Sequence, residues 1–209
     1  MEAAIELAKT IGITLAEIVL TVVFCVQYIR KNYSGPNIGK MVPKQNKIDL
    51  EITDRMDYVK ELVNADRIHI YEFHNGEHYS DYRSAYKFSC SYEVTRAGKK
   101  PARNKCTHLP ISVMPRFIHE ITTKGLFYCP NIEEIKDSMA STFEFKDNLG
   151  IKAFYDVALK NEQGIVIGFL AVQWDKETDV KLKKEEIHQL VWFVESKIKE
   201  SLQLSRKKK

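Results

Sequence analysis

The chain has 209 residues, 29% of them charged, and a formal net charge of only +4 at pH 7. This length suits one membrane segment plus one globular domain, and so small a net charge gives no reason to expect a nucleic-acid partner. The four cysteines form no C-x-x-C pair, which excludes a disulfide scaffold and fits a reducing compartment. Residues 205–209 are basic and predict a solvated tail, with contact to nucleic acid or anionic lipid as the alternative.

An apolar run covers residues 11–29 and is close to the ~20 residues that a helix needs to cross a bilayer. Arg30 and Lys31 follow it, so the positive-inside rule places the C-terminal domain of a single-pass protein in the cytoplasm. The start lacks the basic region and cleavage site of a signal peptide. Residues 1–31 are therefore predicted to be a membrane anchor. A carboxylate at the depth of Glu17 costs roughly 2.5–3.5 kcal/mol, so Glu17 should be protonated, paired or turned toward another helix; the alternative is a helix outside the membrane with Glu17 on a buried face.

A linker is predicted over residues 32–46, which contain Gly35, Pro36, Gly39 and Pro43. Residues 47–64 repeat apolar side chains at helical spacing and predict an amphipathic helix. A strand is expected at 67–73, followed by a polar turn and loop. Residues 84–95 then alternate between apolar and polar side chains, which is typical of a half-exposed or edge strand.

The middle of the chain predicts short elements. A basic loop at 98–110 precedes a helix at 111–124, with Ser112 as its N-cap and Gly125 as its C-cap. A short strand at 126–129 and short helices at 132–139 and 142–148 follow.

Residues 151–159 and 165–174 are two apolar segments joined by a polar turn, and they predict a β-hairpin. Neither segment alternates cleanly, which indicates strands covered on both faces at the centre of a sheet. Residues 181–204 then predict a long amphipathic helix whose apolar stripe includes Val194.

Three runs of sequence resemble the GAF domain, a sheet-based regulatory module akin to PAS domains. They are NADRIHIYEF, KGLFYCPNIEE and LGIKAFYDVALKNEQGIVIGFLAVQW, and the resemblance covers residues 47–204. It implies an α+β fold, with a central antiparallel sheet and helices on both faces. It also implies a pocket between the sheet and the middle helices, and a homodimer formed through the first and last helices of the domain. The runs EFHNG and FSCSYEV are similar to uncharacterised phage and bacterial proteins with GAF-like domains.

The resemblance leaves the ligand open, since GAF domains bind cyclic nucleotides, bilins, haem, small metabolites or nothing. The cyclic-nucleotide signature N-K-x-x-x-F-x-x-x-D/E is absent, and no cysteine has the context of a bilin attachment site. The GAF-type free methionine sulfoxide reductase uses cysteines, but Cys129 lies on a predicted strand rather than in the loop beyond it. Cys90 and Cys129 are therefore expected to be buried, inert thiols, and we do not expect an enzyme.

His74 and His78 are four residues apart and lie beside Glu72 and Glu77. On a helix this spacing would present two ligands to one metal ion. Here the stretch follows a strand and contains Asn-Gly, and a metal needs three or four converging ligands. A solvated turn without metal is expected.

Glu72 and Asp156 interrupt otherwise apolar strands. A buried carboxylate must be paired, hydrogen-bonded or protonated, so each marks either an ion pair with Arg67, Arg83 or Lys87, or a ligand anchor. Nearby aromatic residues would form the walls of such a pocket, with core packing as the alternative. The candidate ligand-binding residues are Glu72, His74, Tyr86, Phe88, Tyr92, Phe143 and Asp156.

Three functions remain open on sequence grounds. A membrane-tethered sensory or regulatory GAF-like module, binding a small molecule or a partner protein, requires a pocket with converging polar groups. An interaction or scaffold protein without a pocket requires an interior filled by the aromatic residues. A phage is one source considered for such a protein. An enzyme requires a nucleophile or an acid–base pair exposed in a cleft, and no spacing in the sequence indicates one.

Overall fold

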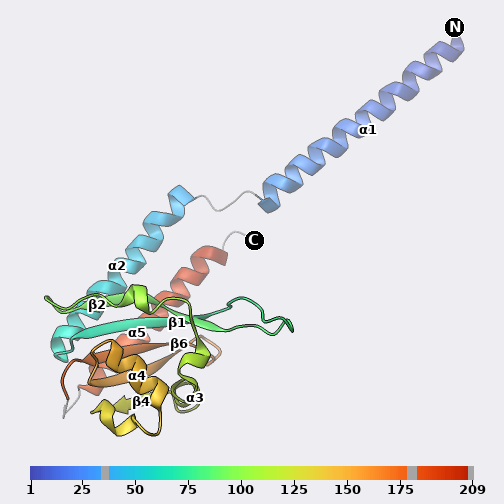
Figure 1. Cartoon of the computed structure of the whole chain (residues 1–209). Coiled ribbons are helices and arrows are strands. Elements are labelled where there is room, and N and C mark those ends of the chain that lie inside the picture. The colour runs from blue at the N-terminus through green and yellow to red at the C-terminus, as the bar shows by residue number, and fades with distance from the viewer. Residues whose placement is uncertain (34–37, 178–182, 207–209) are drawn as a thin grey trace. The chain divides into compact units, whose positions relative to one another are not determined.

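The computed structural model describes residues 1–33, 38–177 and 183–206 (Figure 1). The chain divides into two compact units, Met1–Lys44 and Gln45–Lys209.

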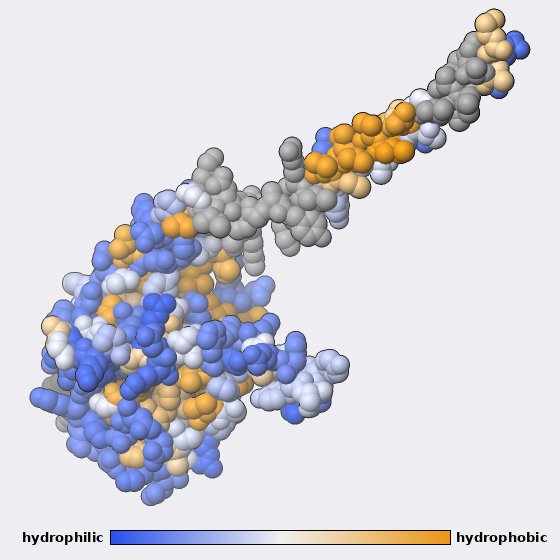
Figure 2. Space-filling view, turned by 45° about the horizontal axis from the view of Figure 1, so that its top comes forward, coloured by the Kyte–Doolittle hydropathy of each residue, from blue (hydrophilic) through white to orange (hydrophobic). Residues whose placement is uncertain are grey.

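The first unit contains helix α1, Glu2–Tyr33. Within the described residues, no helix is both long enough and apolar enough to cross a membrane. The predicted span also includes Ile11, Ile13 and Ile29, whose side chains lie outside the described part. The described part of α1 nevertheless exposes an apolar surface, drawn in orange in Figure 2; its large side chains are Leu15, Ile18, Val19, Leu20, Val22, Val23, Phe24, Val26 and Tyr28.

The predicted linker is shorter in the structure than in the sequence interpretation. Helix α2, Ile38–Leu62, begins before Gly39 and continues through Pro43. Pro43 is inside the helix, beyond the first turn, so its missing N–H removes one backbone hydrogen bond and costs helix stability. Residues 34–37 lie outside the described part. Residues 32–33, which end α1, and residues 38–46 are reassigned from linker to helix.

The second unit is built on a sheet of six strands in the order β3-β2-β1-β6-β5-β4, and each neighbouring pair is antiparallel. The hairpin expected in the second half of the chain is present as β5 and β6, and β6 lies beside β1 at the centre. A Cβ atom on Gly168 would lie 2.0 Å from the Tyr71 carbonyl oxygen, so only glycine allows these two strands to approach. The strands are β1 (Arg67–His74), β2 (Lys87–Thr95), β3 (Leu109–Pro110), β4 (Leu126–Cys129), β5 (Ala153–Lys160) and β6 (Val166–Trp174).

Helices cover both faces of the sheet, as expected (Figure 1). Helix α2 and the last helix α5, Lys184–Arg206, cover one face, here called the outer-helix face. Helices α3, Pro115–Lys124, and α4, Ala140–Asn148, cover the opposite face, here called the middle-helix face. Each face has its own apolar core. Strand side chains alternate between faces, so a residue's parity along its strand decides which core it joins. Strand β2 is the exception, because a bulge opposite Ile70 and Tyr71 changes its register, so that Phe88 and Cys90 join one core and Tyr92 and Val94 the other.

Several local predictions need correction. Helix α3 begins at Pro115 with Met114 as its N-cap, whereas Ser112 lies in the preceding 3₁₀ turn η2, Ile111–Val113. Proline at the first helical position is favoured because its missing N–H has no partner there in any case. The C-cap is confirmed, since Gly125 has a φ of 78°. The short helix expected at 132–139 is only the 3₁₀ turn η3, Ile132–Ile135. The other 3₁₀ turn, η1, covers Arg103–Lys105.

Candidate functional site

The seven candidate residues do not form one site, because the two faces of the sheet separate them. Phe88, Phe143 and Asp156 lie on the middle-helix face. Glu72 and Tyr92 lie on the outer-helix face and line a pocket there.

Aromatic rings fill the middle-helix face. Phe88 is fully buried, and its ring packs against Tyr71 and Phe169 at centroid distances of 5.7 and 5.9 Å. Phe117 from α3 packs on Phe169 at 5.3 Å. Core packing, the alternative considered for these aromatic residues, therefore describes Phe88.

Asp156 forms a buried ion pair on this face. Its Oδ2 accepts a hydrogen bond from Lys146 Nζ at 2.7 Å, and both side chains are almost fully buried. The Lys146 ammonium also lies over the Phe154 ring, 4.1 Å from its centroid. Burial raises the pKa of Asp156 to about 6, against the opposing effect of Lys146. The cation is thus supplied by α4, and not by Arg67, Arg83 or Lys87 as the sequence suggested.

This ion pair belongs to a polar strip with incomplete hydrogen bonding. Within the described residues, buried atoms without a hydrogen-bond partner include Asp156 Oδ1, Thr142 Oγ1 and both amide atoms of Gln173. Gln173 is the register partner of Phe154, so it shares a face with Asp156. Buried polar groups without partners cost free energy, so each of these atoms lowers the stability of the core.

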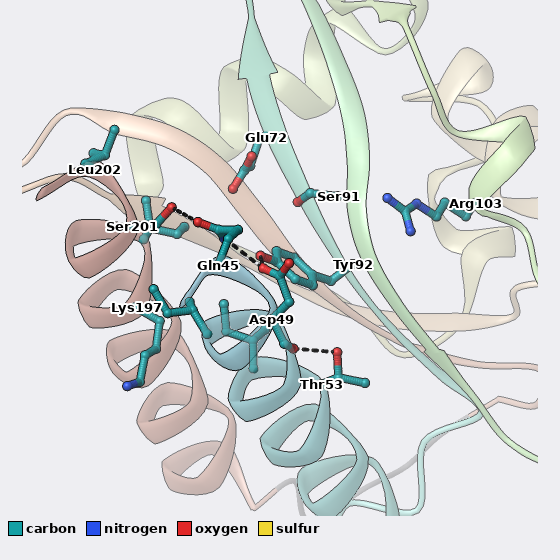
Figure 3. A pocket seen from close by; sticks show the side chains of 13 residues that line it. Gln45, Asp49, Thr53, Glu72, Ser91, Tyr92, Arg103, Lys197, Ser201 and Leu202 are labelled. Carbon is teal, nitrogen blue, oxygen red and sulfur yellow. Dashed lines mark hydrogen bonds between the residues drawn. The ribbon is translucent and has the colours of Figure 1, made fainter. Parts of the chain in front are cut away.

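The outer-helix face holds a pocket of about 550 Å³ between α2, α5 and the sheet (Figure 3). We call it the outer-helix pocket. Its walls come from five regions of the chain, which the topology brings together. They are Gln45, Ile48, Asp49, Ile52 and Thr53 on α2; Glu72, Ser91 and Tyr92 on β1 and β2; Arg103; and Lys197, Ile198, Ser201 and Leu202 on α5.

A chain of hydrogen bonds joins the two helices to the sheet across this pocket. Tyr92 Oη donates to Asp49 Oδ1 at 2.6 Å, and Gln45 Nε2 donates to the same oxygen at 2.8 Å. Ser201 Oγ donates to Gln45 Oε1 at 2.7 Å, which connects α5 to α2 (Figure 3). Burial raises the pKa of Tyr92, and the bond to Asp49 adds to this effect, so its hydroxyl stays protonated.

Glu72 is half-buried in the pocket wall, with its carboxylate directed into the same space as Asp49 (Figure 3). Burial raises the pKa of Glu72, and the charge of Asp49 raises it further. Lys197 does not neutralise Glu72, because its Nζ is paired with Glu51 and Glu200.

His74 and Tyr86 do not line the outer-helix pocket, but the charge of His74 acts on Glu72 and lowers its pKa, against burial and Asp49. His74 Nε2 is hydrogen-bonded to Ser89 Oγ at 2.9 Å, and its ring meets the His108 ring at 5.4 Å. Tyr86 is exposed. Among the described residues, no group of three or more His, Cys, Asp or Glu side chains is placed to hold a metal ion.

The thiols of the domain lie in the core. Cys90, Cys106 and Cys129 are buried and free. Burial raises the pKa of Cys90 to about 12 and that of Cys129 to about 11. Since the thiolate is the reactive form, these thiols are poor nucleophiles.

The sequence interpretation missed a network that positions Arg103. His69 is fully buried and is hydrogen-bonded to Tyr71 Oη and Glu93 Oε1, both at 2.9 Å. Glu93 also accepts from the backbone N–H groups of Ala102, at 2.6 Å, and Arg103, at 3.0 Å. Burial alone would raise the pKa of Glu93, but these hydrogen bonds outweigh it and hold the pKa at about 2. His69 and Glu93 are register partners on β1 and β2, and pairing these two predicted strands was the signal by which the sequence could have indicated the network.

No protein-family model matches the chain, and no curated protein matches it. Among solved structures, it is similar to the phycocyanobilin-bound GAF domain of a cyanobacterial phytochrome, with 15% identity, 78% of this chain and 92% of that chain covered, and a TM-score of 0.57. It is similar to the third GAF domain of Slr1393 from Synechocystis sp. PCC6803, with 13% identity, coverage of 79% and 99%, and a TM-score of 0.56. It is also similar to the cyanobacteriochrome receptor PixJ, with 17% identity, 79% of this chain and 98% of that chain covered, and a TM-score of 0.54.

These likenesses show the fold. The chain has a GAF-like α+β fold with a six-stranded antiparallel sheet, as the sequence resemblance implied. At such low identities they carry no chemistry from those proteins to this one.

Proposed function

We propose that the chain is a GAF-like regulatory module that binds a small molecule in the outer-helix pocket and signals through α2 and α5. The observation that carries this proposal is the pocket itself, where polar side chains from both helices and the sheet converge in a space of about 550 Å³. Pockets of roughly 300–1,000 Å³ with a few converging polar groups are typical small-molecule sites. The similarity to PixJ, described as a receptor, supports a sensory role for this fold.

The position of the pocket suggests how binding would be transmitted. Gln45 and Asp49 on α2 are hydrogen-bonded to Ser201 on α5 and to Tyr92 on β2. A ligand that replaces or tightens these bonds favours one spacing of the two helices over another. A conformational equilibrium shifts only by such a difference in affinity between its two states.

The proposal includes a homodimer formed through α2 and α5. Leu50 and Tyr58 on α2 and Trp192 on α5 are exposed, which supports contact with a second copy. Val194, chosen from the sequence as the residue to test, is fully buried in the core. Replacing Val194 would therefore test the packing of the core and not the dimer. The exposed Trp192 is the better residue for testing the dimer.

The proposal also includes membrane attachment of the N-terminal segment, supported by the apolar run at 11–29 and by the exposed apolar side chains of α1. It includes no catalytic activity. The buried thiols with raised pKa values support this part of the proposal.

A scaffold protein without a ligand is the second candidate function. The packed aromatic rings of the middle-helix face and the buried ion pair of Asp156 favour it, because both fill the space that a ligand would need there.

Thermal unfolding of the full chain with a library of polar metabolites distinguishes these two functions. A ligand at 100 times its Kd adds about 2.7 kcal/mol, or roughly 5–10 °C in Tm for a chain of this size. Such a shift should be lost in Asp49→Asn and kept in Asp54→Asn, a matched change at an exposed position of the same helix. An absence of shifts, or equal shifts in both variants, would favour the scaffold.

A further inference from the structure

Two carboxylates face the outer-helix pocket without a basic partner among the described residues. Asp49 Oδ1 accepts only from the neutral donors Tyr92 and Gln45. Glu72 has no hydrogen bond or ion pair recorded within the described part of the chain. Like charges that share a partly buried space disfavour each other, so a cation between Asp49 and Glu72 would stabilise both.

Arg103 supplies a positive charge at a different wall of the same pocket. Its Nε donates to the Cys90 carbonyl at 3.2 Å, and its backbone N–H is held by Glu93 at 3.0 Å. Its terminal nitrogens have no recorded hydrogen bond among the described residues, and Figure 3 shows the guanidinium directed from beyond β2 toward Ser91. A guanidinium with free terminal N–H groups can bind a carboxylate through two parallel hydrogen bonds.

Apolar side chains complete the lining. Ile48 and Ile52 from α2 and Ile198 from α5 line the pocket, and they also belong to or pack against the apolar core of this face. The pocket therefore offers three kinds of wall: acidic, basic and aliphatic.

Simpler ligands leave part of this lining unpaired. An inorganic anion at Arg103 would leave the two carboxylates facing each other. A metal ion needs more ligands than these two side chains, and no group of three is placed for one among the described residues. An amine alone would make no contact with the exposed guanidinium of Arg103.

We infer that the outer-helix pocket takes a small zwitterion of the amino-acid class, with its ammonium group between Asp49 and Glu72 and its carboxylate at Arg103. This inference rests on the proposed function and gives the class of its ligand. An aliphatic portion of the ligand would lie against Ile48 and Ile52.

The test is isothermal titration calorimetry of the full chain with the standard L-amino acids at ~5 mM. The strongest binder is then compared with its decarboxylated amine and its deaminated acid. We expect each truncated analogue to bind at least about 10-fold more weakly, since losing one charged hydrogen-bonding group costs ~1.4 kcal/mol or more. We expect Glu72→Gln and Arg103→Gln to weaken the intact amino acid by a similar factor.

Two matched variants serve as controls. Glu77→Gln makes the same change as Glu72→Gln, and Lys105→Gln removes one positive charge as Arg103→Gln does. Both control positions are exposed and outside the pocket, and both variants should bind like the wild type. Equal binding by Glu72→Gln or Arg103→Gln would overturn the inference, and so would the absence of any amino-acid binding. If a library compound of another class still binds in an Asp49-dependent way, the proposed function stands and only the amino-acid class fails.

Discussion

Breaking the Lys146–Asp156 ion pair should destabilise the domain far more when one partner is removed than when both are. The two groups are 2.7 Å apart, and their side chains are 2% and 0% exposed. Removing one partner of a buried pair leaves an uncompensated charge and typically costs ~3–5 kcal/mol, whereas replacing both with apolar residues is often neutral. Lys146→Met and Asp156→Leu should therefore each cost ~3–5 kcal/mol, or roughly 6–20 °C in Tm. The double variant should lie within ~1–2 kcal/mol of the wild type.

The pH dependence of Lys146→Met gives an independent check. The folded-state pKa of Asp156 is already raised to about 6 by burial, and removing Lys146 raises it further. A raised carboxyl pKa contributes stability at low pH, and that stability is lost as pH rises from the unfolded value through the folded one. Lys146→Met should therefore be closer to the wild type at pH 5 than at pH 8. Urea unfolding at both pH values measures this. Single variants as stable as the wild type, or a double variant that loses the sum of the two, would refute the reasoning.

Three further outcomes are expected. Because the pKa of Glu93 is held at about 2, the wild type should lose stability as pH falls from about 4.5 toward 2, and Glu93→Gln should flatten this dependence in acid unfolding curves. Trp192→Glu should weaken self-association, as measured by sedimentation velocity, while the circular dichroism spectrum shows that the fold is unchanged. A wild type that is itself monomeric at ~100 µM would contradict the dimer. The full chain should remain with membranes after carbonate extraction, whereas a chain starting at Gln45 should not; the same behaviour of both would contradict attachment.

The sheet was predictable because its signals are local. The apolar hairpin, the strand at 67–73 and the glycine after α3 each follow from a few adjacent residues, and each is present in the structure. Strand β3 was missed because its two residues, Leu109 and Pro110, are too few to show any periodicity. The helical part of the predicted linker was missed because Gly39 and Pro43 outweighed the amphipathic pattern that follows them.

The candidate site was only half predictable. The sequence marked Glu72 and Asp156 as carboxylates in apolar strands, and the structure places them on opposite faces of the sheet. It did not show that the pocket lies against α2 and α5, because that depends on how tightly the aromatic rings fill the other face. Arg103 was not noticed, because it lies in a loop without apolar periodicity. Its position depends on a hydrogen bond from its backbone N–H to Glu93, which the sequence does not show.

Native mass spectrometry of the purified full chain tests the central claim most directly. We expect the wild type, incubated with the compound that raises its Tm most, to carry one added small-molecule mass per protomer. Asp54→Asn should carry the same mass, and Asp49→Asn and Glu72→Gln should not. A chain that carries no added mass under any of these conditions, or one whose added mass persists in both pocket variants, would contradict a ligand site between α2, α5 and the sheet.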